Sequence, residues 1–429
     1  MAPSKGFQLT DRVACIILAG GKGTRLFPLT KHRCKPGVNF GGRYRLIDVP
    51  ISNALNSKMN HIYVISQYFS SSLNKHIKET YPLDHFQGGS INLLTPEERS
   101  EGKIWYEGTA DAVRKNLEIL TKTPADYFLI LSGDQLYNMD LEAMVQFAHD
   151  RDADLTIAAL PVDQTSAPRL GLLSIDSNSN ITGFQEKPKD PEVLKRFQLS
   201  DDFIKNHDIL CMDPPCYLAS MGIYVFKKET LISLLEEDPG HDFGKHMIPA
   251  HLKEKKASAF LYQGYWEDIG TIASYYEANL ALTTNSLGLN FYNEVLPIYA
   301  HNHHLPGARI TETKIMESVI CDGAILEAEE VTHSIIGVRS VVRKGTIIRS
   351  SILLGNHSFS KSDDATFSYE IGENCYIEKA IIDQNVRIGN HVSLKNEKGL
   401  ETYDGDGIYI RDGIIIVTSK ATIPDHFTL

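Results

Sequence analysis

The residues with the clearest chemical potential follow an apolar segment near the N-terminus. Val13 to Leu18 contains no polar residue, which predicts a buried strand, and it leads into Ala-Gly-Gly-Lys-Gly-Thr-Arg at residues 19–25. Glycines allow backbone N–H groups to approach an anion closely, while Lys22 and Arg25 add positive charge. The pattern favours a loop that binds a triphosphate. A glycine-rich turn without a ligand is the alternative.

The spacing within this loop excludes the two most common phosphate-binding motifs. A Walker loop requires serine or threonine after its Gly-Lys pair, but Gly23 follows Lys22. A dinucleotide-binding fingerprint requires a third glycine at the position that Leu26 occupies. We therefore expect a different kind of nucleotide-binding loop.

Two acidic residues stand beside glycines in segments that could carry a metal ion. Asp134 follows the apolar run 129–131, and Asp268 lies in Trp-Glu-Asp-Ile-Gly at 266–270. Two carboxylates that meet at strand ends would form a hard oxygen site for Mg²⁺, which keeps several waters and bridges phosphates. The sequence does not show that they meet. Each could instead cap a helix or end a turn.

The segment Glu186-Lys187-Pro188 follows a predicted strand, and its proline restricts the turn. A carboxylate suits sugar hydroxyls, and an ammonium group suits a phosphate monoester. An exposed ion pair after a strand is an equally good interpretation of these two residues. Because no known nucleophile signature occurs, the residues together suit phosphoryl-type transfer by positioning and charge neutralisation, without a covalent intermediate.

Alternating strand and helix patterns up to about residue 284 must position these groups. A helix at 109–120, capped by Thr109, is typical of the segments between strands. Such alternation predicts an α/β domain with a mostly parallel sheet and helices on both faces. Ligands bind these folds at the carboxyl ends of the strands, where the glycine loop and Asp134 lie. The predicted strands are 13–18, 62–66, 127–131, 155–160, 181–185 and 221–226.

The composition excludes several classes of function. The chain has 429 residues, 42% apolar and 23% charged, and a formal net charge of −11. It has no basic surplus for non-specific nucleic-acid binding, and no apolar run approaches the roughly 20 residues of a membrane span. Met1 to Arg12 lack the apolar core of a secretory signal. We expect a cytoplasmic protein that binds neither nucleic acid nor membrane.

Cysteine usage favours the same reducing, intracellular compartment. The six cysteines have no ligand-spaced pairs of the zinc-site type. Cys211 and Cys216 are the closest two, and we interpret them as unpaired residues of a proline-rich loop.

The C-terminal part has a different periodicity. Residues 285–310 are polar and lack a period, which predicts a linker rather than a metal site at His301, His303 and His304. Over 311–429, interrupted at 355–369, aliphatic residues recur every five or six positions, which predicts a β-helix; an ordinary antiparallel sheet would alternate at two. The repeating residues are Ile325, Val331, Ile336, Val342, Ile348, Leu353, Ile371, Ile377, Ile382, Ile388 and Leu394.

Eight segments resemble the glucose-1-phosphate adenylyltransferase family, also called ADP-glucose pyrophosphorylases. The glycine loop at 18–30 fits any sugar nucleotidyltransferase, but FGGRYRLIDVPISN at 40–53 and GYWEDIGTIASYYEANL at 264–280 are specific to the ADP-glucose branch. The resemblance implies a Rossmann-like nucleotidyltransferase domain at 1–284, then a left-handed parallel β-helix at 311–429 for regulation and oligomerisation. The other matching segments are 105–113, 132–140, 186–188, 219–226 and 241–249.

The resemblance also implies a reaction and its residues. ATP and glucose 1-phosphate would react with Mg²⁺ as cofactor to give ADP-glucose and pyrophosphate. Arg25 and Lys35 would offset charge on the leaving pyrophosphate, and Asp134 and Asp268 would hold the metal ion. The nucleotide would contact Ala19, Gly20, Gly21, Gly23, Thr24 and Thr109. The glucose phosphate would contact Tyr106, Gly171, Glu186, Lys187 and Ser220.

A regulatory site at the domain junction is implied as well, together with a homotetramer and a role in glycogen or starch synthesis. At residues 33–39 the chain has Arg-Cys-Lys-Pro-Gly-Val-Asn, where the family has Arg-Ala-Lys-Pro-Ala-Val-Pro. Near the C-terminus the family's lysine falls on Ser419. A phosphorylated metabolite or phosphate would bind through Arg33, Arg45, His76, Lys379 and Lys420.

Three other functions are compatible with parts of this pattern. A nucleotide-sugar pyrophosphorylase that uses another triphosphate would share the glycine loop and the two acids. A non-catalytic regulatory subunit would share the architecture, although the presence of Arg25, Lys35 and Lys187 argues against it. An acyltransferase would need a longer β-helix and a catalytic histidine, for which only His391 occurs in the second block of repeats.

Overall fold

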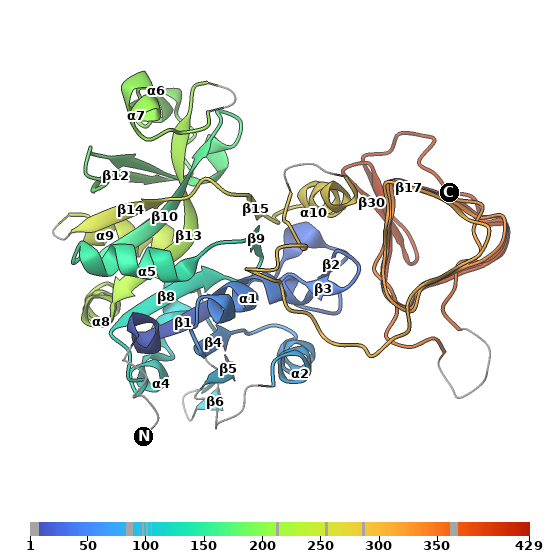
Figure 1. The fold of residues 1–429 in the computed structure, drawn as a ribbon, viewed down its shortest axis with the longest axis horizontal. Coiled ribbons are helices and arrows are strands. Elements are labelled where there is room, and N and C mark those ends of the chain that lie inside the picture. Colours follow the sequence, from blue (N-terminus) through green and yellow to red (C-terminus); the bar gives the residue numbers. More distant parts are fainter. Residues whose placement is uncertain are drawn as a thin grey trace.

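The computed structural model describes residues 8–82, 89–96, 98–99, 102–103, 105–211, 214–253, 256–284, 288–360 and 368–429. Its N-terminal part is built on one large sheet (Figure 1). The strands of this sheet are β1 (Val13–Leu18), β4 (His61–Ile65), β5 (Ser90–Leu94), β8 (Tyr127–Ser132), β10 (Leu155–Val162), β11 (Gly171–Ile175), β12 (Ile181–Glu186), β13 (Tyr217–Lys227) and β14 (Ala257–Leu261).

The strand order is β12-β11-β13-β8-β1-β4-β5, and β10 and β14 extend the sheet from β13. Strands β8, β1, β4 and β5 run parallel, which confirms the predicted parallel sheet for this half. In the other half β13 runs antiparallel to β8, β10 and β11, so the sheet as a whole is mixed. Each of the six predicted strands overlaps an observed one.

Both faces of this sheet are buried, as the apolar run at its centre requires. Val13, Cys15 and Ile17 of β1 contribute to one apolar core, and Ala14 and Ile16 to the other. The longer helices α1 (Asp48–Asn56), α2 (Ser70–Thr80), α5 (Leu141–Asp150) and α8 (Lys228–Glu237) each pack an apolar side against these cores. Helix α10 (Ile272–Leu280) lies between the sheet and the C-terminal domain and contacts that domain (Figure 1). The shorter helices are α6 (Pro191–Arg196), α7 (Asp201–Asn206) and α9 (Ile248–His251).

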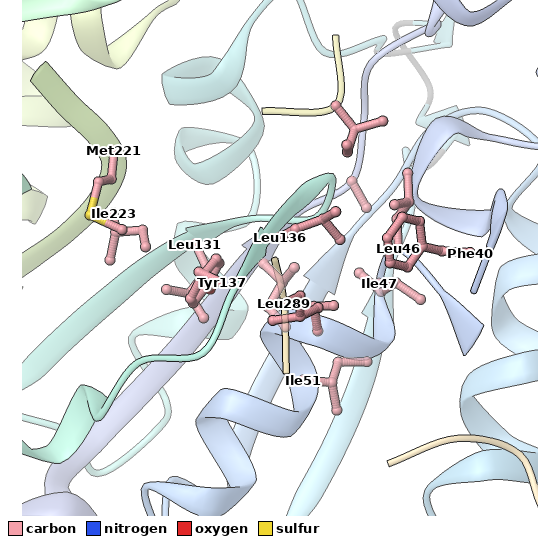
Figure 2. Close-up of a cluster of buried hydrophobic side chains, with 14 of the residues drawn as sticks. Phe40, Leu46, Ile47, Ile51, Leu131, Leu136, Tyr137, Met221, Ile223 and Leu289 are labelled. Carbon is pink, nitrogen blue, oxygen red and sulfur yellow. The ribbon is translucent and has the colours of Figure 1, made fainter. Parts of the chain in front are cut away.

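The core beneath the strand ends connects the sheet to α1. Leu131 of β8 and Tyr137 of β9 (Gln135–Tyr137) belong to the same buried cluster as Ile47 and Ile51. Figure 2 shows these side chains gathered between the sheet and α1. The loops that leave these strands therefore start from a rigid base.

The predicted helix at 109–120 is interrupted. It forms α3 (Thr109–Arg114) and α4 (Leu117–Leu120), because the side-chain amide of Asn116 donates to the Ala112 carbonyl at 2.8 Å and competes with the helical backbone. Thr109 is the first residue of α3 rather than its cap. Its hydroxyl oxygen instead accepts a hydrogen bond from the Phe243 N–H at 3.1 Å.

The C-terminal part is a parallel β-helix with three faces (Figure 1). Its first strand, β16, begins at Arg309, two positions before the predicted start at 311. The aliphatic repeat fills the interior, except that Leu326 rather than Ile325 is buried there. The faces are β16 (Arg309–Ile310), β19 (Ile325–Leu326) and β22 (Val341–Val342); β17 (Lys314–Met316), β20 (Glu330–Thr332), β23 (Ile347–Arg349), β25 (Tyr376–Glu378) and β28 (Ser393–Leu394); and β18 (Val319–Ile320), β21 (Ile335–Ile336), β24 (Ile352–Leu353), β26 (Ala380–Ile382) and β31 (Ile414–Val417).

Two further features complete this domain. Strands β27 (Arg387–Ile388) and β32 (Thr422–Ile423) pair with each other. An antiparallel hairpin of β29 (Thr402–Asp404) and β30 (Ile408–Arg411) is attached to β31. Part of the polar interruption predicted at 355–369 lies outside the described residues.

The two domains share one apolar core. Ile335, Ile352, Ile381 and Ile416 of the β-helix belong to the same buried cluster as the residues under α1 and α10. Such a continuous core predicts that the two domains move as one rigid body and not independently about a linker.

Candidate active site

The glycine loop leaves β1 at the carboxyl ends of the parallel strands. Gly23 has a left-handed backbone with φ of 63°, and a Cβ there would lie 2.9 Å from the Cβ of Lys35. The fold itself therefore requires glycine at this position. A Cβ at Gly21 would meet nothing within 4 Å, and at Gly20 it would meet only Gln67, at 3.9 Å. Protein packing does not require these two glycines, so the space they leave suits a ligand.

The two predicted metal-binding acids come together through a short strand pairing. Strand β15 (Trp266–Asp268) pairs antiparallel with β9, which puts Asp268 opposite Gln135, the residue after Asp134. Lys35 Nζ lies 2.6 Å from Oδ2 of Asp134 and 3.8 Å from Oδ1 of Asp268. The hydroxyl of Ser132 donates to the other oxygen of Asp134 at 2.5 Å. The carboxylates therefore converge on one ammonium group.

The electrostatics of this cluster favour a further cation. Burial raises the pKa of the Asp268 carboxyl, and the charge of Asp134 raises it further, while Lys35 and Arg25 lower it. A pair of carboxylates that repel each other fits Mg²⁺, which takes its remaining ligands from water and phosphates. Within the described ranges no group of three or more His, Cys, Asp or Glu could hold a metal alone.

Glu186 lies in a pocket made by two glycines. A Cβ at Gly171, its partner across β11 and β12, would lie 2.8 Å from Oε2 of Glu186, and so would a Cβ at Gly244. The missing side chain of Gly171 makes room for this carboxylate, and its predicted contact with the sugar stays a prediction.

Lys187 projects from an unusual backbone. Its φ is 45°, in the left-handed region, and its N–H donates to the Leu170 carbonyl at 3.1 Å. Its ammonium group lies 2.9 Å from Oε1 of Glu186, and the side chain is 58% exposed. A non-glycine residue held in this conformation is often functional. The exposed cation is available to a phosphate.

These residues line two adjoining cavities. The first, of about 460 Å³, contains the glycine loop, Thr109, Asp134 and Glu186. The second, of about 770 Å³, contains Arg25, Lys187 and Asp268. The two cavities hold part of the predicted nucleotide, metal and sugar-phosphate residues, and the acids of the first and second cavity share Lys35. Among the predicted residues that line neither cavity are Gly23, Gly171 and Ser220.

Three predicted contacts already make hydrogen bonds within the protein, two through side chains and one through the backbone. The Tyr106 hydroxyl accepts a hydrogen bond from the Asn116 amide at 3.0 Å, although the residue lines the first cavity. Ser220 Oγ accepts the Gly222 N–H at 3.2 Å and is buried. Ala19 is buried and continues β1 by donating its N–H to the Ile65 carbonyl at 2.8 Å. Thr24 is exposed.

Sequence reasoning missed the residue that ties the loop to its surroundings. Gln67 Nε2 donates to the Gly20 carbonyl at 3.1 Å, and its Oε1 accepts the Tyr106 N–H at 2.9 Å. A lone glutamine after a strand gives no signal of such a role. Gln135, Tyr224 and Asp242 also line the first cavity and were not predicted.

The predicted effector residues are only partly together. Arg33 is buried and donates to both oxygens of Asp383 at 2.8 and 3.0 Å, and its Nη1 has no hydrogen-bond partner among the described residues. The main-chain oxygen of Gln384, next to Asp383, accepts from Lys420 N–H at 3.1 Å. Lys379 lies at the opposite end of β26 from Asp383. Strand β26 therefore lies between Lys379 and the ion pair of Arg33 with Asp383.

The other two predicted effector residues differ in their availability. His76 Nε2 lies 2.6 Å from the buried carboxylate of Asp48, so its ring makes a contact within the domain. Arg45 donates to the Ser72 carbonyl at 3.3 Å. Partial burial and the charges of Arg45 and Arg33 lower the pKa of His357 to about 4, which marks this junction as positively charged.

One prediction from cysteine usage is wrong. Cys211 and Cys216 form a disulfide, and their Cα atoms are 6.1 Å apart, within the range that a disulfide can span. The other four cysteines are buried free thiols. In the part of the chain that the structure describes, no helix is long and apolar enough to cross a membrane.

Comparison with known families agrees with this geometry. Residues 14–285 match the family model described as nucleotidyl transferase. Residues 303–428 match the model of the GLGC left-handed parallel β-helix domain. The first match covers more than half of the 429 residues. The chain thus belongs to the nucleotidyl transferase family and has the two-domain architecture characteristic of glucose-1-phosphate adenylyltransferases.

Proposed function

We propose that this protein transfers the adenylyl group of ATP to α-D-glucose 1-phosphate, giving ADP-glucose and pyrophosphate. The observation that carries the proposal is the convergence of Asp134 and Asp268 on Lys35, beside a glycine loop with open space at Gly20 and Gly21. The second domain, of the GLGC kind, favours the ADP-glucose reaction over other nucleotide-sugar syntheses.

The proposed reaction is an in-line displacement at the α-phosphorus. A phosphate oxygen of glucose 1-phosphate forms the new P–O bond, and the bond to the bridging oxygen breaks with its electron pair leaving on pyrophosphate. The nucleophile is already anionic, so no residue has to act as its base. Asp134 and Asp268 would hold Mg²⁺, which supplies neutralisation of phosphate charge when bound.

The side chains contribute by position and charge. Lys35 is held by both acids, with its side chain 9% exposed, and so presents a fixed ammonium group to the reacting phosphates. Arg25 lines the second cavity and adds positive charge beside the glycine loop. Glu186 would accept hydrogen bonds from glucose hydroxyls, and Lys187 would bind the phosphate of the sugar.

The decisive experiment compares nucleotides. Purified full-length protein with Mg²⁺ and glucose 1-phosphate is incubated with ATP, UTP, dTTP, CTP or GTP, and released pyrophosphate and the nucleotide sugar are measured. We expect ADP-glucose as the main product. Equal or faster turnover with UTP or dTTP would assign the protein to another pyrophosphorylase. No turnover with any nucleotide would favour the non-catalytic subunit instead.

We also propose regulation at the domain junction, in a cytoplasmic homotetramer that serves glycogen or starch synthesis. Buried Arg33 has an Nη1 without a hydrogen-bond partner in the described part of the chain, and together with Arg45 and the lowered pKa of His357 this supports an anion site there. A screen of phosphorylated metabolites and phosphate during ADP-glucose synthesis tests this. The effector should change the rate without competing with either substrate. If every anion changes the rates of wild-type protein and Arg45→Ala to the same extent, the site lies elsewhere.

A further inference from the structure

A groove of about 700 Å³ opens beside the glycine loop and is shared by both domains. The β-helix domain contributes Arg411, which belongs to the β29–β30 hairpin, to the lining of this groove. Among the residues that line it, four are cationic and none is acidic. The lining residues are Lys22, Thr24, Arg25, Phe27, Thr30, Lys31, Tyr68, Phe69 and Arg411.

The groove continues the active site. It shares Lys22 and Tyr68 with the cavity that contains Asp134, and Arg25 with the cavity that contains Asp268. None of the predicted sugar-phosphate residues lines it. In an in-line displacement the leaving group departs on the side opposite the nucleophile. The four cations of the groove are therefore available to the leaving group of the proposed reaction.

Arg411 is fixed in place before any ligand arrives. Its Nη2 donates to Asp404 at 2.5 Å, and its Nη1 donates to the Ile410 carbonyl at 2.8 Å. The guanidinium lies 5.9 Å from the ring centre of Phe27 in the glycine loop. It also lies 5.6 Å from the ring centre of Tyr409, which contacts Phe27 edge to face at 5.4 Å.

We propose that Arg411 binds the pyrophosphate leaving group, so that the β-helix domain completes the phosphate end of the active site. This inference rests on the proposed function. Pyrophosphate carries several negative charges, and a preorganised guanidinium binds phosphate oxygens with paired N–H groups. Asp404 occupies one of these groups in the free protein and so competes with the ligand.

Two variants at this contact should change pyrophosphate affinity in opposite directions. Inorganic pyrophosphate with Mg²⁺ is titrated calorimetrically into full-length protein. Arg411→Gln should weaken binding about three- to fivefold, in the range of a partly exposed ionic contact. Asp404→Asn should strengthen it, because the guanidinium loses its competing carboxylate. Arg387→Gln, an exposed arginine on β27, is the matched control and should bind as wild type does.

The kinetics separate binding from a merely structural role. In the reverse reaction Arg411→Gln should raise KM for pyrophosphate and leave KM for ADP-glucose unchanged, whereas a distorted hairpin would change both. Wild-type affinity in a folded Arg411→Gln variant would overturn the inference. If that variant does not fold, unchanged or weaker binding by Asp404→Asn would overturn it. The titration needs no nucleotide, so failure of the ADP-glucose assay is a separate result.

Discussion

The guanidinium of Arg33 in the catalytic domain donates hydrogen bonds of 2.8 and 3.0 Å to the two carboxylate oxygens of Asp383 in the β-helix. Both side chains are buried, with exposed fractions of 9% and 3%. Arg33 lies two positions before Lys35, the first residue of a short helix (Lys35–Gly37), so the ion pair also anchors the segment that carries the central ammonium group.

Asp383→Asn should destabilise the protein strongly, because it leaves a buried guanidinium without its counter-charge. We expect a loss of about 3 kcal/mol in the free energy of unfolding, measured by urea denaturation. Glu118→Gln, which removes a solvent-exposed pair with Lys122, should cost less than about 1 kcal/mol. Equal effects of the two substitutions would mean that the interdomain pair contributes no more than a surface pair.

Asp134→Asn should lower kcat about a thousandfold while leaving the fold intact, since a carboxylate that holds the metal ion is lost. The variant should also lose the rise in melting temperature that Mg²⁺ and ATP produce in wild type. Asp150→Asn on the exposed end of α5 serves as the control. A normal Mg²⁺ response with low kcat would exclude Asp134 as a metal ligand.

Lys187→Ala should raise KM for glucose 1-phosphate about tenfold and change kcat little, because its charge binds a phosphate that is similar in the ground and transition states. Initial rates over a range of glucose 1-phosphate test this at saturating ATP. Lys195→Ala, on the exposed side of α6, should behave as wild type. A loss of kcat with unchanged KM would contradict the assigned role.

Regular apolar patterns explain which parts of the fold were predictable. The unbroken apolar run of β1 and the five- or six-residue period of the β-helix each determine an element locally, and both predictions are confirmed. The shift from Ile325 to Leu326 arose because two adjacent aliphatic residues satisfy the period equally well. The interruption at Asn116 depends on a side-chain hydrogen bond, which apolar periodicity does not contain.

The arrangement of the site was harder to predict than its residues. Asp134 and Asp268 meet only because β9 and β15, each of three residues, pair with each other. Strands so short have no periodicity to detect. The pairing of Arg33 with Asp383 and the closing of the groove by Arg411 likewise depend on how the two domains pack, which no local pattern encodes.

The two kinds of glycine in the loop should respond differently to alanine. At Gly23, alanine would be held at φ of 63° against Lys35, so Gly23→Ala should cost about 1–2 kcal/mol of unfolding free energy for the backbone conformation alone. At Gly21 an added methyl group meets no protein atom within 4 Å. Gly21→Ala should therefore keep the unfolding free energy within about 0.5 kcal/mol of wild type and raise KM for ATP. Urea denaturation and initial rates measure both effects. If Gly21→Ala binds ATP normally, the open space beside Gly21 does not receive the triphosphate.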